Sequence, residues 1–400
     1  MACPHITTRL ASTLFVLAAL AAAPHAHAAV DRAGAATPSP LYVSPSGTDT
    51  GRCTRAAPCA GFDRAYAVAQ PGAIVHVAGG RYGAMTISSR SGRRGPKVVF
   101  QPAGKAPVTV VGELTVRASH LEFRRMTLAD LEVPREARHV TFRGIRNHGF
   151  WLQGPSHITF VGGEVTCGKC PYHPFLVDGG PPDFPPPRNI VFDRVYFHDW
   201  HAAESGQHTE CLQILAGNGV TIRNSVFRNC ATADGGRGAT ANLQISWLGR
   251  GPKTRNILIE NNFFYPSGNH YAINSGDWPN VDFRYNSIAG PIIVGSGWGD
   301  GTPVEFVGNV MRLGECQGPR TGTGVSSRYV YRYNVLEGGT CGPTDRNAPS
   351  GFIHPQKDLR LRPGSAAINA GDPSRYPRRD IDGQRRPMGG RPDAGADEAR

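Results

Sequence analysis

The sequence contains little charge, little lysine and, beyond its first 28 residues, no long apolar run. Charged residues make up 18% of the chain, and only 5 of its 400 residues are lysine, against 38 arginine. No later stretch contains 18 consecutive apolar residues, so we expect no membrane-spanning helix. The chain instead contains 50 Gly and 33 Pro. Because Gly and Pro interrupt helices, this composition predicts strands and turns.

The N-terminus has the pattern of a secretory signal peptide. Arg9 supplies a positive charge, an apolar segment runs from Leu10 to Ala23, and Ala26-His27-Ala28 has the small residues of a cleavage site. We therefore expect a secreted protein, with residues 1–28 as the signal peptide. Residues 29–40 are rich in Ala, Thr, Ser and Pro, which is typical of a flexible linker.

The formal net charge of +12 favours acidic partners outside the cell, such as uronic-acid polysaccharides. Nucleic acid is not expected, because the arginines are scattered and no nucleic-acid-binding module is found. An arginine-rich composition without any role in binding is the alternative.

Nine cysteines are present, and removal of Cys3 with the signal peptide leaves eight. An even number of cysteines in an oxidising compartment predicts disulfides. Their spacing suggests four local pairs: Cys53 with Cys59, Cys167 with Cys170, Cys211 with Cys230, and Cys316 with Cys341. Zinc at Cys167 and Cys170 is the alternative, but a second ligand pair at matching spacing is absent from the sequence.

Order is expected to begin at Leu41, with a strand over Leu41–Val43. Residues 62–69 predict a short helix, because Phe62, Tyr66 and Ala69 fall on one side of it. The open end of a solenoid must be covered by an element that is polar outside and apolar inside. We therefore interpret this helix as an N-terminal cap.

Beyond this helix, short segments with apolar residues at alternate positions recur about every 18 to 37 residues. These segments are Val98–Phe100, Leu121–Phe123, Val140–Phe142, Ile158–Phe160, Ile190–Phe192, Val220–Ile222, Ile257–Ile259, Val281–Phe283, Val304–Phe306 and Tyr329–Tyr331. Stacked coils of such strands bury one continuous interior, which a single coil cannot do. The pattern predicts an all-β parallel β-helix over residues 41–360. Leucine-rich repeats would show a fixed Leu spacing, and propeller blades would be longer.

A second set of strands alternates in the same way. Leu152, Val177, Leu212, Leu243 and Ile273 are expected to point inward, which leaves Gln153, Asp178, Gln213, Gln244 and Asn274 pointing outward. On strands about 4.8 Å apart, five such side chains would line a groove of about 19 Å. The alternative is an ordinary polar face without function.

The densest polar stretch, residues 198–213, leads into this ladder. We expect His208, Glu210 and Gln213 at the edge of one coil, Asn242 and Gln244 on the next, and then His270, Asn274 and Asp277 with Trp278. Amides can bind hydroxyls, an aromatic ring can cover a sugar face, and titratable groups can transfer protons. This mix predicts a site for a sugar.

Residues 250–255 read Arg-Gly-Pro-Lys-Thr-Arg and are followed by Asn-Asn-Phe-Phe at 261–264. This segment resembles the Arg-x-Pro-x-x-Arg segment of pectate lyases. The resemblance implies that Arg250 takes the proton α to a uronate carboxylate and that Arg255 binds the substrate's acid group. The Trp-Ile-Asp-His motif of that family is absent, so its calcium-binding aspartates have no counterpart from that motif. The paired aspartates and Gly-His-Gly of polygalacturonases are absent as well.

The last segment, residues 361–400, resembles the ending of many secreted bacterial right-handed β-helix proteins, and residues 42–47 resemble their start. Together they span nearly the whole mature chain. The resemblance implies a single-stranded right-handed parallel β-helix of the pectate-lyase type. We interpret residues 361–400 as a structural closing segment. A calcium loop is the alternative, although the spacing of an EF-hand is lacking.

The resulting hypothesis is a secreted, monomeric polysaccharide lyase that acts on an acidic polysaccharide by β-elimination. The candidate catalytic residues are Arg250, His208 and Glu210, with Arg250 or His208 as the base. The candidate substrate-binding residues are Arg255, Gln153, Gln213, Gln244, Asn242, His270, Asn274 and Asp277. Asp178 and Glu210 are the candidate ligands if calcium takes part, and no other cofactor is expected. A non-catalytic glycan-binding β-helix, and a glycoside hydrolase or uronate epimerase on the same scaffold, are the alternatives.

Overall fold

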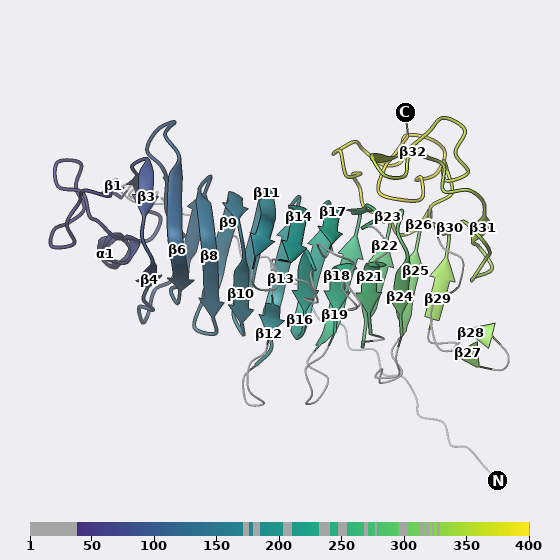
Figure 1. Cartoon of the computed structure of the whole chain (residues 1–400), viewed down its shortest axis with the longest axis horizontal. Coiled ribbons are helices and arrows are strands. Elements are labelled where there is room, and N and C mark those ends of the chain that lie inside the picture. The colour runs from purple at the N-terminus through teal and green to yellow at the C-terminus, as the bar shows by residue number, and fades with distance from the viewer. Residues whose placement is uncertain are drawn as a thin grey trace, which may run out of the picture. The chain divides into compact units, whose positions relative to one another are not determined.

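The computed structural model describes residues 38–170, 176–178, 185–202, 210–231, 241–246, 254–267, 271–276, 278–295, 303–312, 316, 320–321, 324–325 and 329–399. Their strands pair in parallel along three rows, which we call sheets A, B and C. Each coil of the chain passes from sheet A to sheet B and then to sheet C (Figure 1). The expected parallel β-helix is confirmed. No helix among these residues has the length and apolarity to cross a bilayer.

Sheet A contains β1 (Leu41–Val43), β2 (Ile74–Val77), β5 (Val98–Pro102), β7 (Leu121–Arg124), β9 (Arg138–Asn147), β11 (Ser156–Cys170), β13 (Arg188–Asp193), β16 (Gly217–Arg223), β19 (Thr254–Glu260), β22 (Val281–Arg284), β25 (Val304–Val307) and β29 (Tyr329–Arg332). Sheet B contains β3 (Gly80–Tyr82), β6 (Val108–Val116), β8 (Thr127–Pro134), the later parts of β9 and β11, β14 (Tyr196–Ala202), β17 (Val226–Ala231), β20 (Phe263–Phe264), β23 (Ser287–Ile288), β26 (Val310–Met311), β30 (Val335–Leu336) and β31 (Arg346–Asn347).

Sheet C contains β4 (Met85–Ile87), the later parts of β6 and β8, β10 (Phe150–Gln153), β12 (Leu176–Asp178), β15 (Leu212–Ile214), β18 (Ala241–Ile245), β21 (Tyr271–Ser275) and β24 (Ile292–Val294). Two antiparallel hairpins stand apart from the coils, β27 (Arg320–Thr321) with β28 (Gly324–Val325) and β32 (Phe352–His354) with β33 (Asp358–Leu361).

The interior is filled by aromatic rings that stack from coil to coil. On sheet A, neighbouring ring centroids lie 4.8 to 5.4 Å apart along the series Phe100, Phe123, Phe142, Phe160 and Phe192. These rings are buried because alternate residues of each strand face the same side. The recurring Phe at the end of each apolar segment thus forms one continuous stack.

Helix α1 (Phe62–Val68) covers the N-terminal end of this stack. Its Phe62 ring lies 5.1 Å from Phe100, and Phe62 and Tyr66 are fully buried. The expected capping helix is therefore confirmed, one residue shorter than the sequence pattern suggested. The helix thus continues the aromatic stack at its N-terminal end.

A buried ladder of asparagines lines the corner between sheets A and B in the last coils. Asn262, Asn286, Asn309 and Asn334 each donate from Nδ2 to the side-chain Oδ1 of the next coil at 3.0 Å, and the ladder ends on Asp345. Each amide also donates to a backbone carbonyl of the coil before. An amide carries both donors and an acceptor, so it can satisfy the backbone where the chain turns between sheets.

The closing segment, residues 362–399, packs along the outer face of sheet B beside β23 and β26 (Figure 1). Backbone N–H groups of Gly395 and Ala396 donate to Gly308 O and Ser287 Oγ, at 2.7 and 3.0 Å. Ala367, Ala394 and Ala396 form a second apolar core with outward residues of sheet B, among them Phe263, Val310 and Val335. This part of sheet B is therefore apolar on both faces.

Three of the expected disulfides are confirmed: Cys53–Cys59, Cys211–Cys230 and Cys316–Cys341. Cys167 is also disulfide-bonded. The side chain of Cys170, its expected partner, lies outside the part of the chain whose side chains the structure describes.

Candidate functional site

Alternate positions of sheet C are in register across the coils. Their successive pairing partners are Thr86, Thr115, Glu132, Trp151, Leu176, Gln213, Gln244, Asn274 and Ile293, which we call the sheet C row. Sequence neighbours of these residues, such as Leu131, Leu152 and Leu243, are buried in the core. With strands about 4.8 Å apart, the part of the row from Glu132 to Asn274 extends about 24 Å.

The amide part of the row contains three residues that the sequence placed in the ladder. Gln213, Gln244 and Asn274 are direct partners on β15, β18 and β21, and each is half-buried. Gln244 Nε2 donates to Ser246 Oγ at 3.4 Å, and its Oε1 is buried with no hydrogen-bond partner among the residues described. Buried acceptors are normally paired, so this oxygen is available to a donor from a ligand or water.

Gln153 and Asp178 lie beside the row, which corrects the expected ladder. They pair with each other, but Leu176 rather than Asp178 lies opposite Gln213. The strand pairing is thus displaced by two residues at β12 relative to the expectation. A shift of two residues keeps the same face of the sheet because side chains alternate with period two.

The sequence analysis overlooked the N-terminal part of the row. Trp151 is 43% exposed, although its neighbours Phe150 and Leu152 are fully buried. The hydroxyl of Thr115 lies 2.9 Å from Glu113 Oε1 and 3.2 Å from Glu132 Oε2. The sequence does contain a signal for this part of the row. In β8, Glu132 stands between two buried apolar residues, so the alternation of the strand places it outward.

This N-terminal part is acidic. Burial raises the pKa of the Asp130 carboxyl, the charges of Glu113 and Glu132 raise it further, and a hydrogen bond from the Leu131 N–H opposes them. Neighbouring carboxylates disfavour a further negative charge. We therefore expect this end of the row to accept sugar hydroxyls or cations rather than uronate groups.

Three residues expected at the solvent edge are buried, which corrects their expected exposure. Glu210 and Asn242 are 0% exposed, and Asn242 Nδ2 donates to Tyr265 O at 2.7 Å. Trp278 is 3% exposed, and its Nε1 donates to Ile245 O at 3.0 Å. These groups lie beneath the outer surface, so a polymer on the sheet C row cannot contact them directly. The exposed ring on this row is Trp151.

Arg255 belongs to sheet A rather than to the row. It is exposed near the start of β19, opposite Asn218 of the coil before. The expected site residues Arg250, His208, His270 and Asp277 lie outside the described residues.

Among the residues that the structure describes, no group of three His, Cys, Asp or Glu side chains is arranged to hold a metal ion. Of the two candidate ligands, Glu210 is fully buried and the side chain of Asp178 is not among those described. We therefore derive no chemical step through a metal.

No protein-family model and no curated protein matches the chain. Among solved structures, pectate lyase Pel9A is 15% identical with a TM-score of 0.48, over 90% of this chain and 96% of that one. A rhamnogalacturonan lyase is 11% identical with a TM-score of 0.36, over 78% of this chain and 90% of that one. At such identities a likeness concerns the fold alone, so the chemistry of the site has to be argued from its residues.

Proposed function

We propose that the chain is a secreted polysaccharide lyase that cleaves an acidic, uronate-containing polysaccharide by β-elimination. The observation that carries this proposal is the sheet C row, in which the exposed ring of Trp151 and three amides lie in register, with the strand of Leu176 between the ring and the amides. A row of about 24 Å matches several sugar units. Trp151 offers an apolar face to a sugar ring, and the amides offer donors and acceptors to its polar groups.

In β-elimination a base removes the proton on the carbon next to the uronate carboxylate. The electron pair then forms a double bond to the neighbouring carbon, and the glycosidic oxygen on that carbon leaves with a proton. Groups that bind the carboxylate stabilise the charge that develops there. We assign the base to Arg250 or His208, on the sequence pattern, and carboxylate binding to Arg255 and Gln244.

The charge distribution along the row supports cleavage near Gln244. The amides of Gln213, Gln244 and Asn274 give this part of the row hydrogen-bond donors on three paired strands. Glu113 and Glu132, by contrast, would repel a uronate at the other end of the row. A neutral or cation-bridged stretch of polymer fits that end better.

Secretion is part of the proposal and rests on two features. The N-terminal residues have the pattern of a signal peptide, and three disulfides lie within the described residues. Disulfides persist in oxidising compartments and are rare in the cytosol.

The test is to incubate the mature chain with a panel of uronate polysaccharides, with and without a calcium chelator. The unsaturated product is followed by its ultraviolet absorbance, and reducing ends are measured in parallel. We expect both signals to rise together on at least one polymer. Gln244→Ala should lower kcat/KM on that polymer at least about tenfold, since a contact to the developing charge is lost. Gln356→Ala, an exposed glutamine on the β32–β33 hairpin, is the matched control and should leave kcat/KM unchanged.

Two outcomes would contradict the proposal. Reducing ends without unsaturated product would show hydrolysis on the same scaffold. Binding to a uronate polymer without either product would show a non-catalytic glycan-binding protein.

A further inference from the structure

The closing segment contains a pocket that is separate from the sheet C row. Its volume is about 560 Å³, and four arginines line it together with Ser374, Tyr376 and two prolines. Small-molecule sites typically have volumes of roughly 300 to 1,000 Å³. The pocket is therefore large enough for a single sugar unit.

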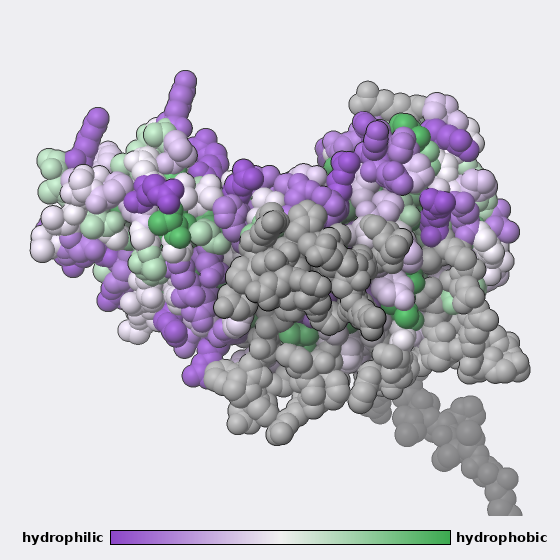
Figure 2. All heavy atoms as spheres, in the orientation of Figure 1, coloured by the Kyte–Doolittle hydropathy of each residue, from purple (hydrophilic) through white to green (hydrophobic). Residues whose placement is uncertain are grey.

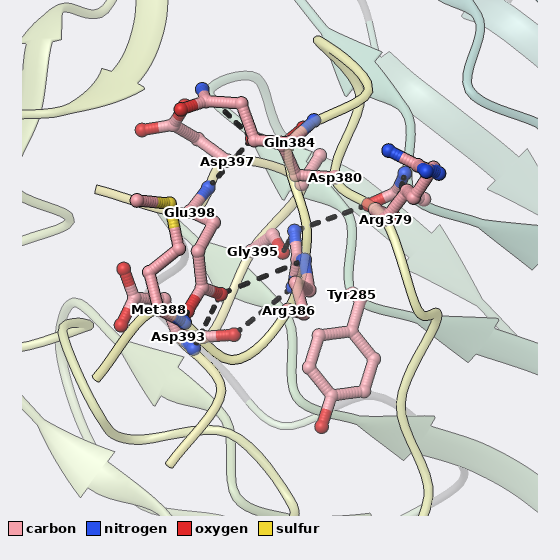
Figure 3. A network of polar contacts seen from close by, with 12 residues as sticks. Tyr285, Arg379, Asp380, Gln384, Arg386, Met388, Asp393, Gly395, Asp397 and Glu398 are labelled. Atoms are coloured by element: carbon pink, nitrogen blue, oxygen red, sulfur yellow. Dashed lines mark hydrogen bonds and ion pairs between the residues drawn. The ribbon is translucent and has the colours of Figure 1, made fainter. Parts of the chain in front are cut away.

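Arg386, one of the lining residues, is held in place by a network of polar contacts (Figure 3). Its side chain is fully buried, and its guanidinium donates to Asp393 O at 3.2 Å, to Gly395 O at 2.9 Å and to Asn261 Oδ1 at 3.2 Å. Nε lies 3.7 Å from Glu398 Oε2. Burial lowers the pKa of Arg386, and the charge of Glu398 opposes this effect. The Nη1 and Nη2 donors of Arg386 are thus engaged by the protein, which leaves ligand binding to the rim.

The rim is positively charged. Arg375, Arg378 and Arg385 are exposed around the opening. Arg375 Nη1 lies 3.7 Å from a carboxylate oxygen of Glu305, which Arg284 and Arg332 also contact. Within the part of the chain that the structure describes, neither Arg378 nor Arg385 forms an ion pair.

Two acidic groups, Glu260 and Glu398, lie near the arginines of the pocket. Burial raises the pKa of Glu260, while Arg284, Arg223, Arg386 and Arg375 lower it. The carboxylate of Glu398 is engaged by the backbone N–H groups of Met388 and Asp393. Two guanidinium groups without carboxylate partners therefore remain to attract an anion.

We propose that this pocket binds an acidic sugar unit, with its carboxylate between Arg378 and Arg385 and its ring against Tyr376. Guanidinium groups bind planar carboxylates through two parallel hydrogen bonds. Tyr376 and the two prolines give the pocket flat, apolar faces of the kind that cover a sugar ring. The choice of a uronate as ligand rests on the proposed function, whereas the preference for an anion rests on the arginines.

The pocket adjoins the corner between sheets A and B, because Arg386 contacts Asn261 and lies over the Tyr285 ring at 5.2 Å. The sheet C row belongs to another sheet of the coil. A polymer that binds at both places is held more strongly than one that binds at a single place, because binding at the first raises the effective concentration of polymer at the second. We therefore expect the pocket to contribute to polymer affinity and not to the cleavage step.

The test uses methyl galacturonoside, which has no substituent on O4 to eliminate and so cannot be consumed. Binding is measured by calorimetry and ligand-observed NMR, with neutral methyl galactoside and inorganic sulfate as comparisons. We expect the galacturonoside to bind most tightly. The double variant Arg378→Ala/Arg385→Ala should bind it at least tenfold more weakly. Arg362→Ala, an exposed arginine of the closing segment that does not line the pocket, should bind as the wild type does.

The proposal is overturned if the double variant binds the galacturonoside as the wild type does. It is also overturned if galactoside or sulfate binds equally well, because the pocket would then not select an acidic sugar. The variant Arg378→Gln/Arg385→Gln is the control for folding. If its melting temperature is unchanged, a loss of galacturonoside binding in it does not come from a folding defect. A chain that cleaves no uronate polymer would contradict the proposed function while leaving this binding test intact.

Discussion

The outer faces of sheets B and C differ, although both belong to the same coils. In the last coils, sheet B presents apolar residues such as Phe263 and Val310, and the closing segment covers them. Sheet C presents Gln213, Gln244 and Asn274 at the equivalent outward positions, half-buried. Figure 2 shows that the described surface is hydrophilic over most of the face in view. Inward residues build the scaffold, and outward residues decide whether a face binds the chain itself or a ligand.

The largest loss of stability in the closing segment, which covers sheet B, is expected from Arg386→Ala. The variant leaves Glu398 buried without its ion pair and removes three hydrogen bonds, two within the closing segment and one to Asn261. Breaking a buried pair in this way costs about 3–5 kcal/mol. We expect faster hydrogen exchange of the closing-segment amides, with the coils near α1 unchanged.

The control for this variant is Arg386→Met/Glu398→Gln, which removes both charges and should recover part of the loss. If the closing-segment amides of Arg386→Ala exchanged at the wild-type rate, the packing of the closing segment on sheet B would not depend on this buried charge.

A smaller, pH-dependent effect on the stability of the closing segment is expected from Asp397. Burial raises the pKa of this carboxyl to about 6, against an opposing hydrogen bond from the Leu361 N–H. Because the folded-state pKa lies above the unfolded value of 3.8, the stabilisation is present below pH 3.8 and is lost as pH rises through about 6. This change in the pKa of Asp397 corresponds to roughly 3 kcal/mol.

The measurement is the stability of the closing segment by hydrogen exchange between pH 4 and pH 6.5. We expect a decline with rising pH that is flatter in Asp397→Asn, which keeps an acceptor for the Leu361 N–H. If stability declined with pH equally in the wild type and in Asp397→Asn, Asp397 would not be the cause of the decline.

The smallest effect on stability is expected from a variant on the sheet C row. Trp151→Ala removes an exposed ring, so the free energy of unfolding should change by about 0.5 kcal/mol or less. Its polymer affinity should fall roughly tenfold, or about 1.4 kcal/mol, because the sugar loses its apolar contact. Calorimetry with the polymer substrate measures this, and Ile353→Ala, an exposed apolar residue on the β32–β33 hairpin, is the control. Equal loss in both variants would show that the row is not the binding face.

Much of the fold could be predicted because its signals are local. Alternating apolar residues such as Leu121 and Phe123 specify an inward face by backbone geometry alone. The disulfide partners lie close in sequence, so spacing was sufficient to pair Cys53 with Cys59. The capping helix followed from Phe62 and Tyr66 on one side of a single helical segment.

The candidate site could be predicted only in part. Gln213, Gln244 and Asn274 are in register as expected, but Asp178 is displaced and Glu210 is buried. Loops of different length join the coils, so the register between strands about 18 to 37 residues apart depends on pairing that no local pattern records. The burial of Asn242 likewise depends on its contact with Tyr265 of the next coil.

The sequence by itself determined which side chains face the interior, because a strand's period of two is a property of the local backbone. Only the tertiary structure decided which outward side chains line up and which face the closing segment covers. Both depend on contacts between residues far apart in the chain, such as Arg386 with Asn261, and these form only when the coils are stacked.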